Sequence, residues 1–184
     1  INPEGGKEST GLVTRFTTTP PQGLTPEFPI RLHLLSEMDV VRVLANTYYA
    51  DCEHKQMPDA EAMRSALERL TQTARQSSPG ASSVTADDVE DLREYLNRNF
   101  LSKPRVQMLQ QGYWAQAVSL APLLPLSYRA ELFGIIWNNQ PKFQQLFLEL
   151  CQALEALGNP AEADCPLEAL LPRQTSIIDV ALLA

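Results

Sequence analysis

The sequence predicts a mainly α-helical fold, a compact bundle of six or seven helices with a small N-terminal β-hairpin or extended arm. From residue 36 onward, apolar side chains recur every three or four residues, which is the period of an amphipathic helix. Residues that begin and end helices divide this part into segments of ordinary helix length. Residues 1–30 differ, because they hold five of the fourteen prolines and four of the eight glycines. That composition is typical of a linker or a loosely attached arm.

These shifts in composition divide the chain into an arm at 1–30, a helical domain at 31–160 and a C-terminal tail at 161–184 with an apolar end. Two stretches near the N-terminus favour strands: 11–18 is rich in β-branched residues, and 28–35 alternates with a period close to two. We expect either a small hairpin or a single strand lying on the helical body.

The first three helices are predicted from their starts. Ser36 with Asp39 three residues later resembles a capping box. A second helix should begin near Asp59 and end before the loop at 77–80. Thr85 should cap a third, whose first turns are acidic as the helix dipole favours.

The second half of the sequence contains signals for four more helices. Pro104 opens a short one that ends at Gly112, and Pro suits the first helical position because no N–H is needed there. Further helices are expected at 113–121, 127–137 and 141–157, the last ended by a Gly-Asn-Pro sequence. We expect its apolar residues to form one buried face: Phe143, Leu146, Phe147, Leu150 and Leu154.

Charge and cysteine content exclude several classes of protein. Fifteen basic and twenty-two acidic side chains give a net charge of −7, and no cluster of Lys and Arg is present to neutralise a phosphate backbone. Nucleic-acid binding is therefore disfavoured. No run of about 18 apolar residues is present, so no membrane span is predicted, and we expect a soluble protein. The widely spaced Cys52, Cys151 and Cys165 fit no disulfide framework, which favours the cytoplasm or another reducing compartment.

One acidic cluster is a candidate metal site. Residues Asp87–Asp91 read Asp-Asp-Val-Glu-Asp, with two carboxylates one helical turn apart that could hold Mg²⁺. The pattern resembles the aspartate-rich motif of all-α isoprenoid synthases, a resemblance limited to these five residues. The same residues also stand at a helix start, where the dipole alone favours acids.

Cysteine and histidine offer the only nucleophilic pairs. Cys52 or Cys151 would need His33 or His54 as a base, and a zinc site at Cys52 and His54 would need ligands from elsewhere in the chain. Phosphate-binding and dinucleotide-binding glycine motifs are absent from the sequence. We therefore assign no catalytic residue, metal ligand or cofactor. Enzymatic activity is left open and is the less favoured interpretation.

Residues 103–121 have the outline of a helix-turn-helix. The would-be recognition helix at 114–121 has no Lys or Arg and little polar surface with which to read bases. Its composition is that of a core helix.

The feature with most bearing on function is a region poor in charge. Between Val106 and Leu148 only Arg129, Glu131 and Lys142 are charged. Such a region forms either the centre of the bundle or a contact surface, because protein interfaces are depleted in Lys and Glu and enriched in aromatics. The candidate contact residues in the region and in the apolar tail are Trp114, Trp137, Phe143, Gln144, Ile177, Ile178 and Leu182.

The leading hypothesis is a non-enzymatic helical protein–protein interaction domain: an adaptor, a regulator or an assembly subunit of a larger protein or complex. Its partner would be another protein or a second copy. One alternative is an enzymatic or effector fragment that uses Asp87–Asp91 or Cys52 with His54. A second alternative is a helical bundle that binds an apolar ligand in a cavity.

Overall fold

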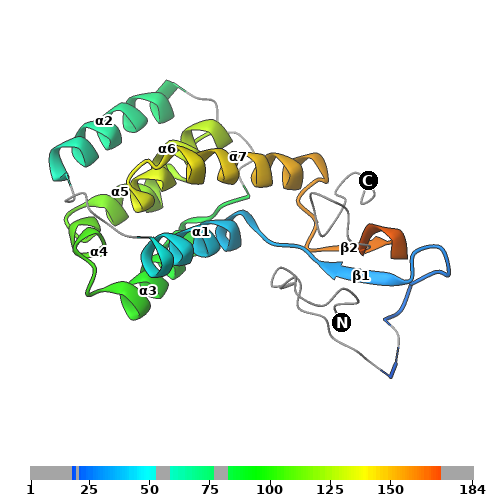
Figure 1. Ribbon diagram of the computed structural model, residues 1–184. Helices are drawn as coiled ribbons and strands as arrows, with labels where there is room; N and C mark the ends of the chain where they lie inside the picture. The colour runs from blue at the N-terminus through cyan, green and yellow to red at the C-terminus, as the bar shows by residue number, and fades with distance from the viewer. Residues whose placement is uncertain (1–17, 20, 53–58, 77–82, 171–184) are drawn as a thin grey trace. The chain divides into compact units, whose positions relative to one another are not determined.

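A computed structural model describes residues 18–19, 21–52, 59–76 and 83–170 (Figure 1). The chain divides into two compact units. The larger unit spans residues 35–159, and the smaller combines the residues before 35 with those from 160 onward.

The larger unit is helical. Its elements in chain order are α1 (Glu37–Asp51), α2 (Ala60–Gln76), α3 (Ala86–Phe100), α4 (Pro104–Leu109), α5 (Tyr113–Leu120), α6 (Leu126–Gly134), the 3₁₀ turn η1 (Ile135–Trp137) and α7 (Pro141–Ala156). The expected helix at 127–137 is thus an α-helix that tightens into a 3₁₀ turn at its end. A positive φ of 56° at Asn138 then ends the turn.

The predicted helix starts are confirmed by their hydrogen bonds. The Ser36 hydroxyl accepts from the Asp39 backbone N–H, and the Asp39 carboxylate accepts from the Ser36 N–H. Thr85 and Asp88 form the same reciprocal pair at the start of α3. Each pair satisfies backbone donors that an α-helix leaves open in its first turn.

The end of α7 is also fixed by hydrogen bonds between residues close in sequence. The N–H of Gly158 donates to the Glu155 carbonyl, and the N–H of Asn159 donates to the Leu154 carbonyl. This pair of hydrogen bonds needs a residue with left-handed backbone, which Gly158 supplies with a φ of 81°.

The core of the helical unit is continuous and rich in aromatic side chains. Five of its largest side chains are almost completely buried: Tyr49, Tyr113, Phe133, Trp137 and Phe147. The two buried tyrosine hydroxyls donate to main-chain carbonyls, Tyr49 to Ile136 at 2.6 Å and Tyr113 to Leu132 at 3.1 Å. Burial raises the pKa of both phenols.

The smaller unit contains a two-stranded antiparallel sheet. β1 (Ile30–His33) pairs with β2 (Glu162–Cys165), with Ile30 opposite Cys165 and His33 opposite Glu162. Leu32, Cys165 and Ala169, the last in the 3₁₀ turn η2 (Leu167–Leu170), form its small buried cluster.

The predicted class is confirmed: the structure is mainly helical with a small two-stranded sheet. The second strand, however, comes from the segment at 162–165 and not from a local N-terminal hairpin. The strand expected at 11–18 lies almost wholly outside the described residues.

Candidate functional site

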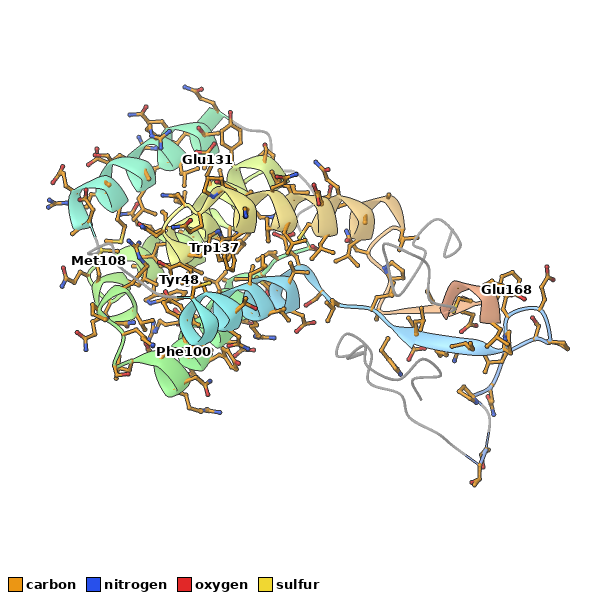
Figure 2. The ribbon with its side chains drawn as sticks, in the orientation of Figure 1. Tyr48, Phe100, Met108, Glu131, Trp137 and Glu168 are labelled. Carbon is orange, nitrogen blue, oxygen red and sulfur yellow. The ribbon has the colours of Figure 1, made fainter. Side chains whose placement is uncertain are left out.

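Both tryptophans proposed as contact residues lie in the core. Trp114 is 3% exposed. Trp137, which is labelled in Figure 2, is fully buried, and its ring centroid lies 6.4 Å from that of Phe143 and 6.1 Å from that of Phe147. Of the two roles that the sequence allowed for this charge-poor region, the structure gives these residues the core role. A partner cannot reach either indole while the helices stay packed.

Phe143 and Gln144 lie at the edge of the core. The Phe143 ring is half-buried and meets the Tyr48 ring edge-on, with centroids 5.8 Å apart. The Gln144 amide donates to the Ala130 carbonyl at 3.4 Å. The remaining candidates, Ile177, Ile178 and Leu182, lie outside the described residues.

The face of α7 that points to solvent is the main exposed feature of this region. Leu146 is 44% exposed and Leu150 is 40% exposed, although the sequence predicted both to be buried. Since a helix advances 100° per residue, Phe147 and Cys151 take the core side and leave the two leucines beyond its edge. The stripe continues at the half-buried Ala153 and Leu157; we call Leu146, Leu150, Ala153 and Leu157 the α7 stripe.

The neighbouring helix α1 runs antiparallel to α7. Tyr48 near the end of α1 meets Phe143 at the start of α7, whereas Arg129 joins Glu37 at the start of α1 to Glu155 near the end of α7. Val43, midway along α1, is 51% exposed. The α1/α7 pair therefore carries three large apolar side chains in contact with solvent.

A second exposed feature lies between α1 and α3. Five residues line a hollow of about 400 Å³: Arg42, Asp91, Glu94, Tyr95 and Arg98. The hydroxyl of Tyr95, one of the lining residues, donates to the Asn46 side chain at 2.9 Å and joins α3 to α1. We call this hollow the α1/α3 groove.

Comparison with known families gives a match that covers residues 1–184. The matching family is described as "putative bacterial virulence factor". The chain belongs to this family. No curated protein and no solved structure matches it.

In this member of the family, two residues of the acidic cluster at Asp87–Asp91 make contacts within α3 and at its start. Asp88 closes the capping box with Thr85, and Glu90 pairs with Arg93 at 2.8 Å. Asp87 and Asp91 are exposed. Within the described parts of the chain, no three His, Cys, Asp or Glu side chains converge in a way that suits a metal ion.

Two of the three cysteines, Cys151 and Cys165, are buried thiols that are not activated as nucleophiles. Burial, aided by the nearby Glu37 carboxylate, raises the pKa of the Cys151 thiol to about 12. Burial also raises the pKa of Cys165. A thiol becomes a nucleophile only as the thiolate, so both shifts oppose catalysis. Cys52 is half-buried against the core, and its proposed partner His54 lies outside the described residues.

The remaining sequence candidates are also placed. His33 is exposed on β1, 3.3 Å from Glu162. The helix considered for base reading, α5, buries Tyr113, Trp114 and Leu120. No described helix is long and apolar enough to cross a membrane.

Sequence reasoning missed the α7 stripe because the apolar arc of this helix, from Ala153 to Cys151, covers about 160° of its circumference. Leu146 and Leu150 follow the same spacing as the buried Phe147 and Cys151, displaced by one residue. The width of the apolar surface was the available signal, since a helix that packs on one side needs a narrower stripe.

Proposed function

We propose that the helical unit is a protein-interaction module, non-enzymatic, which acts as an adaptor, regulator or assembly subunit of a larger protein or complex. The observation that carries this proposal is the exposure of Leu146 and Leu150 one turn apart on α7. Each exposed leucine leaves apolar surface in water, and covering it would contribute roughly 25 cal/mol per Å².

The partner that fits the α7 stripe is an amphipathic helix of another protein. The stripe repeats at intervals of four, three and four residues, which is the spacing of a helix that packs side by side with another helix. The exposed Lys142 and Glu149, seven residues apart, flank it. A partner helix with an apolar seam and one charge of each sign on that flank would complement both.

The scarcity of charge in the region where the stripe begins supports the same proposal. Of the three charged residues between Val106 and Leu148, Arg129 is buried in an ion pair and Glu131 lies 3.9 Å from Arg69 of α2. On α7 the charged residues Lys142 and Glu149 lie along one flank of the stripe, and its four residues carry no charge. Interfaces that bind proteins are depleted in charge at their centres, as the seam of the stripe is.

The test is site-specific crosslinking followed by reconstitution. A photoreactive residue at position 146 should crosslink a partner, whereas the same residue at Leu101, which is 50% exposed at the end of α3, should not. The crosslinked protein is then purified and titrated against the unmodified chain. Capture alone does not count as support, because binding must be saturable with purified components.

A paired variant gives the decisive comparison. Leu146→Glu with Leu150→Glu should abolish the binding, because it places two carboxylates in a contact that excludes water. Leu101→Glu is the matched control and should leave binding unchanged. Equal affinity of the paired variant and the unmodified chain would refute the proposal. Sedimentation shows whether the crosslinked partner is a second copy.

A further inference from the structure

The α7 stripe lies beside α1, and two contacts fix the register of these antiparallel helices (Figure 1). The Tyr48 ring meets the Phe143 ring at one end. At the other end, the Arg129 guanidinium contacts the carboxylates of both Glu37 and Glu155. The two contacts are eleven residues apart on α1 and twelve residues apart on α7. Because every α-helix rises equally per residue, the same alignment holds along both helices.

This register places Val43 of α1 between the levels of Leu146 and Leu150. Val43 comes five residues before Tyr48 and therefore lies level with position 148 of α7. All three apolar side chains are exposed. Single apolar side chains scattered over a surface are normal, whereas three at one level of two adjacent helices form a patch, which is typical of an interaction site.

The exposed leucines lie on the side of α7 that is next to α1. Phe143, whose ring meets α1, is followed by Leu146 and Leu150 after three and seven residues, so the three share one face of the helix. On α1, Val43 and Thr47 are one turn apart and both exposed. We call Val43, Thr47, Leu146 and Leu150 the α1/α7 patch.

A helix of another protein fits this patch better than other occupants do. A third helix that lies along two antiparallel helices buries side chains of both, as in a helical bundle. It needs an apolar face about 100° wide or more, whereas the narrower seam of a two-stranded coiled coil would contact α7 alone. A second copy fits less well, because two chains with a net charge of −7 repel each other.

The charges beside the patch lie on one side only. Lys142 and Glu149 flank the stripe on α7, whereas α1 has no charged residue between Arg42 and Asp51. A complementary helix therefore carries an acid and a base seven residues apart on its α7 flank. Its α1 flank is apolar or neutral.

From this arrangement we infer that the partner helix lies over the α1/α7 patch and contacts both helices through a wide apolar face. The inference rests on the proposed function, which requires contact with the α7 stripe alone. Its new content is that α1, through Val43, forms part of the binding site.

The test uses two synthetic helical peptides and the full chain. The wide-face peptide has leucines at i, i+3, i+4, i+7, i+8 and i+11. The narrow-face peptide has the same length and composition, with leucines only at the a and d positions of heptads. Both carry a glutamate and a lysine seven residues apart on one flank. In NMR titrations of the isotope-labelled chain, the wide-face peptide should bind about 10-fold more tightly. Its saturable shifts should include the signals of Val43, Thr47, Leu146 and Leu150.

Variants of Val43 decide the inference. Val43→Glu should weaken binding of the wide-face peptide about 10-fold or more, because it places a carboxylate in a contact that excludes water. Val43→Ala should weaken binding less, and the matched control Leu101→Glu should leave it unchanged. Urea denaturation checks that each variant is folded.

The outcomes separate this inference from the proposed function. If Leu146→Glu with Leu150→Glu abolishes binding but Val43→Glu does not weaken it, the inference is wrong and the proposed function stands. Equal affinity of the two peptides, or no saturable binding of either, would also overturn the inference. Sedimentation of the unmodified chain as a dimer that Val43→Glu dissociates would show that a second copy is the occupant, which contradicts it as well.

Discussion

Arg129 holds Glu37 in a buried two-pronged ion pair, with Nε to Oε1 and Nη2 to Oε2 both at 2.7 Å. The third guanidinium nitrogen, Nη1, donates to the Leu124 carbonyl at 2.7 Å. Both side chains are less than 10% exposed. The pair joins α6 to the first turn of α1, across 92 residues of sequence.

Removing one member of this pair should destabilise the protein strongly. Arg129→Met leaves the Glu37 carboxylate buried without its partner, and we expect a loss of about 3 kcal/mol or more in the free energy of unfolding. Urea denaturation measures it. Adding Glu37→Leu to Arg129→Met should recover most of the loss. As the control, Arg64→Ala breaks the exposed pair with Glu61 and should cost less than about 1 kcal/mol.

The two capping boxes should each contribute measurably to stability. Ser36→Ala and Thr85→Ala remove a hydroxyl that accepts from a first-turn N–H, and each should cost about 1 kcal/mol. Ser119→Ala removes an exposed hydroxyl that bonds the Ala115 carbonyl within α5, and it should cost less than about 0.5 kcal/mol. Equal losses for all three variants, measured by thermal and urea unfolding, would contradict a capping role.

Cys151 should be inert in the folded protein and should make stability fall at high pH. Its pKa is about 12 when folded against 9.0 for the free thiol, so the folded state keeps a proton that the unfolded state releases. This contribution is fully present below pH 9 and is lost as the pH rises toward 12. Cys151→Ala should reduce the slope of unfolding free energy against pH above 9. Rapid reaction of Cys151 with a thiol reagent at pH 8 in the folded protein would contradict the assignment.

Arg31 should control the titration of Asp164. Hydrogen bonds of 2.8 and 2.9 Å from the Arg31 guanidinium hold the pKa of the Asp164 carboxyl below its usual range. The stabilisation is present above the ordinary carboxyl pKa and is lost as the pH falls through the lowered value. In an NMR titration, Arg31→Gln should raise the Asp164 pKa, whereas Arg93→Gln, in the helical unit, should leave it unchanged.

The sequence alone was sufficient for what depends on neighbouring residues. Helices begin or end where the pattern predicts at five residues: Ser36, Thr85, Pro104, Pro141 and Gly158. These positions are predictable because capping and terminating residues act within one turn of the chain. The mainly helical class follows from the same local signals.

Only the tertiary structure decided which side of each helix is covered. Because the apolar surface of α7 is wide, the sequence period is compatible with burial of either Leu146 and Leu150 or Phe147 and Cys151. In the structure Phe147 packs against the core rings of Phe133 and Trp137, so Phe147 and Cys151 are buried. The partners of Glu37 and of β1 lie far away in sequence, and neither has a local signal. Burial and long-range pairing depend on how the elements pack. For this reason the tryptophans lie in the core and leucines of α7 form the exposed candidate site.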